Sequence, residues 1–177
     1  MSAGRPIVMA FTGASGAPYG VRLLQALVQA ERRVSLIVSS HGLRLLQAET
    51  PFESVEGLRA HVGGTAWDRW VTLYDDADRG AGPASGSHRA SAMVICPCSM
   101  GTLAAIAAGT SRSLVERAAD VSLKERRPLI LVTREMPLSA IHLENMLRLT
   151  HAGAVVMPAS PGFYNRPTMI EELMDFV

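Results

Sequence analysis

Cysteine is scarce in this sequence, and its placement excludes the usual structural uses of the thiol. The chain has 177 residues but only two cysteines, Cys96 and Cys98, separated by a single proline. In an extended segment both side chains would point to the same face, and residues two positions apart cannot close an ordinary disulfide. Two thiols are also too few to hold a structural zinc ion. We therefore interpret both as small core residues of a protein in a reducing compartment.

Long apolar runs and an excess of charge of one sign are also missing. No run approaches the ~18 apolar residues of a membrane span, and residues 1–6 lack the pattern of a signal peptide. Lys and Arg number 17 and Asp and Glu 16, so the net charge of +1 attracts neither nucleic acid nor an anionic membrane. These absences predict a cytoplasmic protein with no membrane span and no nucleic-acid partner.

Motifs for metal binding and hydrolysis are absent as well. No serine stands in the G-x-S-x-G pattern of a nucleophile elbow. The histidines are dispersed, and none has a metal-ligand spacing to another His, Cys or carboxylate. They are His41, His61, His88, His142 and His151. We expect neither a metal site nor a hydrolytic triad.

What the sequence does have is a series of short apolar runs, each followed by a helical pattern. Runs of four to six apolar residues without alternation are typical of strands covered on both faces. Strands that alternate with helices predict a parallel sheet wrapped on both sides. We therefore predict an α/β fold: a three-layer Rossmann-like (flavodoxin-like) domain with a central, mostly parallel sheet. The expected strands are 6–11, 34–38, 92–96, 129–132 and 154–157.

Two regions and the end of the chain fit this alternation poorly. Residues 50–70 have a weak helical pattern, in which Trp67 and Trp70 would lie about one turn apart. The pattern leaves open whether these two tryptophans belong to the core, to an interface or to a lid. Residues 75–89 form a polar, glycine-rich stretch that is either functional or mobile. No repeat or linker divides the chain, so we expect one domain over 1–177. The apolar face of 168–177 is still incomplete where the sequence stops, which suggests a missing C-terminal tail.

Small hydroxyl and glycine residues follow four of the expected strands. In an open parallel sheet ligands bind at the carboxyl ends of the strands, and free amides at helix starts favour an anion. Any one serine is explained as a helix cap. Together, the four strand ends indicate a phosphate pocket for a ligand the size of a mononucleotide. The residues at these ends include Gly13, Ala14, Ser15, Ser39, Ser99, Met100, Gly101, Thr102 and Arg134.

The segment 116–127 carries the highest density of charge in the chain. Arg117 and Lys124 are seven positions apart and so share one face of the predicted helix. One interpretation is a solvated face with ion pairs between neighbouring turns. The other is a cationic wall for a second phosphate, in the site of the same subunit or of a neighbouring one.

Several segments resemble the flavin prenyltransferase (UbiX) family, and the likeness extends over nearly the whole chain. These segments are 12–20, 97–103, 116–129, 134–137 and 161–167, the long charged one being the most specific. The resemblance implies a metal-independent transferase that joins a dimethylallyl group to N5 and C6 of reduced FMN. The donor would be dimethylallyl phosphate, with the number of its phosphates left open. Prenylated FMN would then serve a UbiD-type decarboxylase in a pathway such as ubiquinone biosynthesis.

The resemblance also implies roles for individual residues and a dodecamer with active sites at subunit junctions. Arg117, Lys124 and Tyr164 would bind the prenyl donor. Ser15, Glu49 and Glu135 would be catalytic, with the proton transfer not divided between the two glutamates. FMN would be bound by Gly13, Ala14, Ser15, Ser39, Ser99, Met100, Gly101, Thr102 and Arg134.

Two departures from the family pattern leave alternatives open. A basic residue that the family has beyond position 177 is not in this sequence, and Ser40 stands where many relatives have lysine. A flavin-dependent cysteine decarboxylase of the same fold is one alternative function. A non-catalytic flavin carrier is another.

Overall fold

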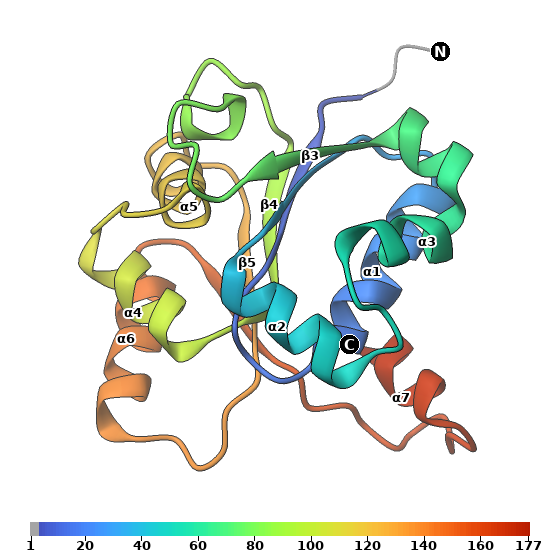
Figure 1. Ribbon diagram of the computed structural model, residues 1–177. Coiled ribbons are helices and arrows are strands. Elements are labelled where there is room, and N and C mark those ends of the chain that lie inside the picture. Colours follow the sequence, from blue (N-terminus) through green and yellow to red (C-terminus); the bar gives the residue numbers. More distant parts are fainter. Residues whose placement is uncertain (1–3) are drawn as a thin grey trace.

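The computed structural model describes residues 4–177 as three layers, with a parallel sheet between two layers of helices (Figure 1). The six-stranded sheet has the order β3-β2-β1-β4-β5-β6, and all its strand pairs are parallel. The predicted three-layer Rossmann-like fold is thereby confirmed. The chain reverses its direction of travel across the sheet between β1 and β4, which is where doubly wound sheets bind ligands. The strands are β1 Ile7–Phe11, β2 Val34–Val38, β3 Val71–Asp75, β4 Ala92–Cys98, β5 Leu129–Thr133 and β6 Val155–Pro158.

The helices divide between the two faces of the sheet. On one face lie α1 (Ala17–Gln29), α2 (Ser40–Glu49), α3 (Val55–Trp70) and α7 (Ile170–Phe176). On the other lie α4 (Met100–Ala108), α5 (Leu114–Lys124) and α6 (Ala140–His151). Within residues 4–177, no helix is long and apolar enough to cross a membrane.

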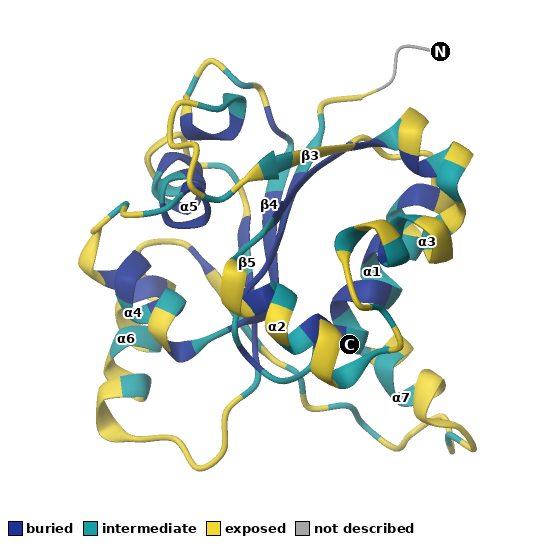
Figure 2. Ribbon diagram, viewed as in Figure 1, coloured by how far each residue is buried: buried dark blue, intermediate teal, exposed yellow. Residues whose placement is uncertain are grey.

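Strand side chains alternate between two buried clusters, one under each helical layer. Figure 2 shows buried residues along the central strands of the sheet. In β1, Met9 and Phe11 pack toward α1, whereas Val8 and Ala10 pack toward the opposite helices. Burial on both faces explains why the strand sequences are continuously apolar. Trp67 joins the cluster beside α1 with 6% of its surface exposed, so it is a core residue.

Strand β3 was not expected from the sequence. It begins at Val71, directly after α3 ends at Trp70, so no turn residues mark the boundary. It pairs with β2 alone and forms an edge of the sheet. Only Val71 is buried in it, while Leu73 is 48% exposed. An edge strand needs no continuous apolar run, and the search for such runs therefore missed it.

The expectation that Cys96 and Cys98 share a face is wrong. Cys96 belongs to the cluster beside α1, and Cys98 belongs to the cluster beside α4 and α5. The pairing of β4 with β5 shifts register between Ile95 and Cys98, which breaks the simple two-residue alternation. Both thiols are free and buried, as the core interpretation predicted.

Candidate functional site

A cleft of about 540 Å³ lies at the carboxyl edge of the sheet. The loop after β1 and the first turns of α2, α4 and α5 form its walls. The first turn of an α-helix leaves backbone N–H groups without partners inside the helix, and these favour an anion. The starts of α2 and α4 offer such groups to the cleft, whereas at α5 Asp76 accepts the N–H groups of Leu114 at 2.8 Å and Val115 at 2.9 Å. Among the residues expected to bind or act on the flavin, those lining this cleft are Gly13, Ser39, Ser99, Met100, Gly101, Thr102 and Glu135.

Ser39 and Ser99 serve as helix caps and line the cleft at the same time. The Ser39 hydroxyl accepts the N–H of Gly42 at 3.0 Å, at the start of α2. The Ser99 hydroxyl accepts the N–H of Thr102 at 3.1 Å and donates to the Thr102 hydroxyl at 3.0 Å. The capping and ligand-binding interpretations of these serines are therefore compatible.

Thr12 fixes the two loops that meet at the centre of the cleft, a role that the sequence did not reveal. Its buried hydroxyl donates to the carbonyl of Pro97 at 2.8 Å and accepts the N–H of Ser99 at 2.9 Å. Gly13, the next residue, approaches α2 so closely that an added Cβ would lie 2.6 Å from Cβ of His41. A side chain at position 13 would thus collide with the wall of the cleft.

Two predicted site residues hold the loop that carries Ser15. Oε2 of Glu49 accepts the N–H groups of Gly16 at 2.7 Å and Ala17 at 2.9 Å. Gly16, the N-cap of α1, has φ +113° and provides no side-chain cap, so the carboxylate from α2 takes that place. Nε of Arg134 donates to the carbonyl of Ser15 at 3.3 Å. Ala14, in the same loop, is buried.

Glu116 holds the loop at the start of α5, which forms one wall of the cleft. Its carboxylate accepts the Thr110 hydroxyl at 2.9 Å, the backbone N–H of Arg112 at 2.8 Å and the Arg112 guanidinium at 2.9 Å. Burial alone would raise the pKa of Glu116, but these hydrogen bonds lower it below its ordinary value. The spacing of Ser113 and Glu116 is that of a capping box, a signal that could have identified this residue.

A second, smaller cavity of about 250 Å³ adjoins the cleft at the ends of β5 and β6. Arg134 and Glu135 line it together with the apolar side chains of Met136, Leu138 and Met146. Glu135 lines both spaces and is exposed. A polar cleft and a largely apolar cavity therefore meet at one carboxylate.

The three residues expected at the prenyl donor do not line the cleft of the same chain. Arg117 donates to the carbonyl of Ala84 at 3.3 Å and pairs with Asp120 at 2.7 Å. Lys124, the last residue of α5, pairs with the adjacent Glu125, the C-cap of that helix.

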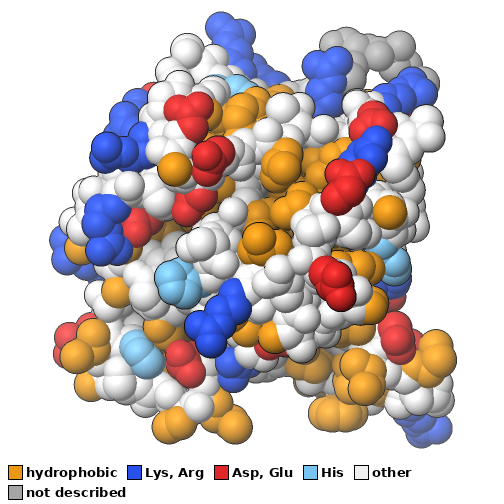
Figure 3. Space-filling view, in the orientation of Figure 1, with side chains coloured by type: hydrophobic (Ala, Val, Ile, Leu, Met, Phe, Trp, Pro, Cys, Tyr) orange, Lys and Arg blue, Asp and Glu red, His pale blue; other side chains and the backbone are white. Residues whose placement is uncertain are grey.

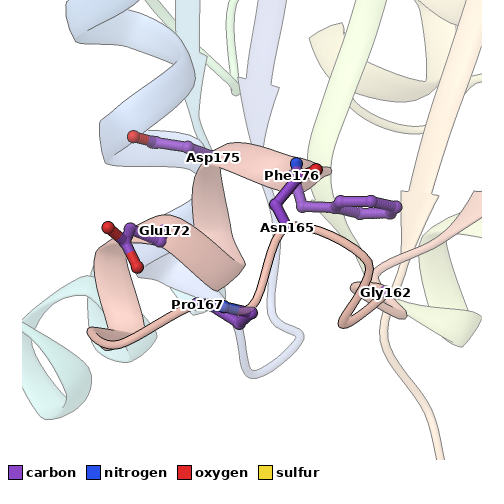
Figure 4. Close-up of a pocket in the computed structure, with 6 residues that line it drawn as sticks. All are labelled: Gly162, Asn165, Pro167, Glu172, Asp175 and Phe176. Atoms are coloured by element: carbon purple, nitrogen blue, oxygen red, sulfur yellow. The ribbon is translucent and has the colours of Figure 1, made fainter.

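Tyr164 is 88% exposed in the segment before α7, with its ring 6.3 Å from that of Phe176. Figure 4 shows the pocket beside this segment, where Phe176 and Asn165 border a space separate from the cleft. In the same view Asp175 points away toward α1, where it pairs with Arg22 at 2.7 Å.

The thiols provide no nucleophile for this site. Burial raises the pKa of Cys96 to about 12 and raises that of Cys98 as well. Within residues 4–177, no three His, Cys, Asp or Glu side chains come close enough together to hold a metal ion. The chemistry of the cleft therefore depends on hydroxyls, helix N-termini, guanidinium groups and carboxylates.

The amino-acid sequence of this chain is similar to that of known flavoproteins over nearly its whole length. The Flavoprotein family matches residues 1–176. Flavin prenyltransferase UbiX of Pseudomonas aeruginosa is 49% identical over 183 aligned residues, which cover 100% of this chain and 87% of the relative. This chain belongs to the UbiX flavin prenyltransferase family. The resemblance noted in the sequence is confirmed, and with it the assignment to the transferases.

Two solved structures of UbiX proteins agree with the fold. AnUbiX, crystallised with FMN and dimethylallyl pyrophosphate, is 43% identical with a TM-score of 0.88, covering 97% of this chain and 86% of the other. A protein described as a dodecameric, FMN-dependent UbiX-like decarboxylase of Escherichia coli O157:H7 is 43% identical with a TM-score of 0.87, covering 96% of this chain and 88% of the other.

The cleft suits FMN on physical grounds. Its volume lies within the usual range for small-molecule sites, roughly 300–1,000 Å³. The N-termini of α2 and α4 favour a phosphate, and the hydroxyls of Ser39, Ser99 and Thr102 suit ribityl and ring oxygens. An added Cβ on Gly101 would meet only the Ser99 hydroxyl, at 3.9 Å, so the backbone of α4 is open to a flat ring.

Proposed function

We propose that this protein transfers a dimethylallyl group from dimethylallyl phosphate to N5 and C6 of reduced FMN, which yields prenylated FMN. The observation that carries the proposal is the convergence of the N-termini of α2 and α4 with three hydroxyl side chains on one cleft. Reduced FMN supplies the nucleophilic N5 and C6 atoms, and the protein supplies position and charge. We further propose that residues 1–177 act as a single flavin-binding domain.

Loss of the donor phosphate places negative charge on the leaving group, and cations fixed beforehand stabilise it. Arg134 lies beside the Ser15 loop and lines the apolar cavity next to the cleft. We assign this cavity to the dimethylallyl group and Arg134 to its phosphate, as well as to FMN. No metal ion is required by this arrangement, because guanidinium and ammonium groups take its place.

The proton that leaves C6 needs an acceptor at the junction of cleft and cavity, and Glu135 lies there. The oxygen Oε2 of Glu49 is already bound to two backbone N–H groups. We therefore assign proton transfer to Glu135 and the positioning of the Ser15 loop to Glu49. Ser15 itself would act on the flavin through its hydroxyl.

Arg117, Lys124 and Tyr164 complete the donor site when subunits assemble. Their distance from the cleft in one chain supports a site at a subunit junction, and a dodecameric relative makes a dodecamer the expected assembly. A UbiD-type decarboxylase would receive the product. The buried free thiols suit a reducing compartment, and the cytoplasm is the proposed location.

An anaerobic incubation with reduced FMN tests the function directly. Dimethylallyl monophosphate and dimethylallyl diphosphate are supplied in separate reactions, and the flavin is then analysed by mass spectrometry. A mass gain of one five-carbon unit with either donor supports the transferase. Decarboxylation of a cysteine-terminated peptide would instead identify a cysteine decarboxylase. Bound but unchanged flavin with both donors would identify a carrier.

A further inference from the structure

Arginines gather at the amino ends of the strands, on the edge of the sheet opposite the cleft. One stands one to three positions before the first residue of every strand from β1 to β5. Since all strand pairs are parallel, their amino ends lie along the same edge. In the order of the sheet from β3 to β5, the arginines are Arg69, Arg33, Arg5, Arg89 and Arg127.

Backbone hydrogen bonds hold the starts of these strands side by side. The N–H of Ile7 donates to the carbonyl of Arg33, that of Ser91 to Pro6 and that of Met93 to Pro128, each at 2.8 Å. With neighbouring strands about 4.8 Å apart, the row from β3 to β5 spans roughly 19 Å. The five arginine positions thus form a continuous row along the sheet, in which the Arg127 guanidinium is bound to the carbonyls of His88 and Gly86 and the neighbouring Arg126 is exposed.

Most of these guanidinium groups have no acidic partner. Arg5, Arg32, Arg33, Arg69, Arg89 and Arg126 are exposed, and we call these six the arginine edge. None of the six forms a salt bridge within the described part of the chain. Figure 3 shows Lys and Arg side chains along the upper rim, where β1 begins.

The carboxylates beside the arginine edge are mostly engaged elsewhere. Asp68 pairs with Arg59, and Glu125 pairs with Lys124. Glu31 is the exposed exception next to Arg32. Since the whole chain carries a net charge of only +1, this edge is a local concentration of positive charge. The flavin and donor phosphates do not explain it, because their site lies at the opposite ends of the strands.

We propose that the arginine edge binds an acidic, carboxylate-rich segment of a partner protein. A guanidinium binds a carboxylate through two parallel hydrogen bonds, and an extended peptide presents a side chain to the same face about every 7 Å. A row of roughly 19 Å therefore meets about three carboxylates of one strand-like segment.

Other anionic partners fit the arginine edge less well. Among the exposed large apolar side chains of the described chain, Val155 at the start of β6 lies near this edge, whereas Ile141 and Phe163 lie in other segments. One such side chain does not make the apolar face that inserts into a lipid surface. Stacking platforms for nucleic-acid bases are also lacking: Trp70 is half-buried, and the Arg69 guanidinium lies 4.9 Å from its ring centroid.

The test uses a fluorescein-labelled peptide of alternating glutamate and serine, titrated with the FMN-loaded protein at low and at physiological salt. The edge variant R32E/R33E/R89E is compared with the matched control R44E/R79E/R166E, which makes the same charge change at exposed arginines elsewhere. We expect at least about a tenfold weaker affinity for the edge variant and a change of less than about twofold for the control. Both variants should bind FMN like the wild type, which verifies their folding.

Four outcomes would overturn the proposal. In the first, the wild type does not bind the peptide at low salt. In the second, the edge variant and the control variant lose peptide affinity equally. In the third, the wild type binds single-stranded DNA or phosphatidylserine vesicles more tightly than the peptide. The fourth is a smaller assembly mass for the edge variant, because the arginine edge would then be a contact between copies of this chain.

Discussion

At the scale of single residues, side chains of the site form hydrogen bonds to the backbone that hold its loops in place. Glu49 is the clearest case, since the family resemblance suggests a catalytic carboxylate while the structure has its oxygen bound to Gly16 and Ala17. A carboxylate at a helix N-terminus is stabilising by both hydrogen bonding and the helix dipole. Glu49, which is distant in sequence, therefore holds the Ser15 loop in position.

Substitution of Glu49 separates positioning from proton transfer. Glu49→Gln keeps one acceptor oxygen, so we expect FMN affinity and the pH profile of prenylation to remain close to those of the wild type. Glu49→Ala removes the cap and should lower the free energy of unfolding by about 1 kcal/mol and weaken FMN binding. Flavin titration and single-turnover rates against pH measure both effects.

Glu135→Gln is the matched comparison for Glu49→Gln, since it makes the same change at the exposed carboxylate of the cleft. It should slow prenylation by roughly a hundredfold or more while FMN stays bound. A Glu49→Gln protein with normal FMN affinity and an equally slow rate would contradict the positioning role.

At the scale of elements, the start of α5 depends on one buried carboxylate. Glu116 is 8% exposed and accepts hydrogen bonds from Thr110 and from Arg112, which lines the cleft. Its lowered pKa means that the ionised carboxylate is more stable in the folded state than in the unfolded state. This stabilisation is fully present above the ordinary carboxyl pKa and is lost as the pH falls through the lowered folded-state value.

Glu116→Gln should therefore be destabilising in a pH-dependent manner. We expect a loss of about 1–3 kcal/mol in the free energy of unfolding near pH 7, because charge-assisted hydrogen bonds are lost. The difference from the wild type should begin to shrink below the ordinary carboxyl pKa of 4.5, where the unfolded wild-type chain takes up a proton at Glu116, and should vanish once the folded side chain is protonated too. Urea unfolding at several pH values measures this.

The control for this series is Glu144→Gln, at an exposed position on α6. Its unfolding free energy should differ little from the wild type over the whole pH range. A Glu116→Gln difference that stayed constant down to pH 3 would refute the assigned pH dependence.

At the scale of the whole molecule, the cleft of one chain lies apart from the residues expected at the prenyl donor. Arg117 and Lys124 lie on α5 beside the 79–91 loop, engaged with Ala84, Asp120 and Glu125. If the active site forms between subunits, one chain supplies the cleft and another supplies these cations. Exposed apolar side chains on α6, among them Ile141 and Leu147, provide surface for such contacts.

Mixed oligomers test whether the site is shared. Arg117→Gln and Glu135→Gln subunits, each inactive alone, are co-expressed with different tags, and the mixed assemblies are purified. Random assembly should restore about one quarter of the wild-type sites, since one pairing in four joins an intact cleft with an intact Arg117. Prenylation by the mixture is compared with that of each parent, and no recovery would mean that both residues act within one chain.

Most of the fold could be predicted from the sequence, because a strand that is buried on both faces is a continuous run of apolar residues. The predicted strands at 34–38 and 129–132 match β2 and β5 within one residue, and the helical segment 50–70 contains α3. Edge strand β3 was missed, since a half-exposed strand has no apolar run. The opposite faces of Cys96 and Cys98 were missed, since a register shift depends on the neighbouring strand.

The sequence by itself also determined the family and the set of strand-end residues, because parallel strands must bring their carboxyl ends to one edge. Only the tertiary structure decided what these residues do to one another. Contacts between Glu49 and Gly16, between Thr12 and Pro97, and between Arg134 and Ser15 join residues 33, 85 and 119 positions apart. Such contacts depend on how separate elements pack in three dimensions, and local sequence patterns carry no record of them.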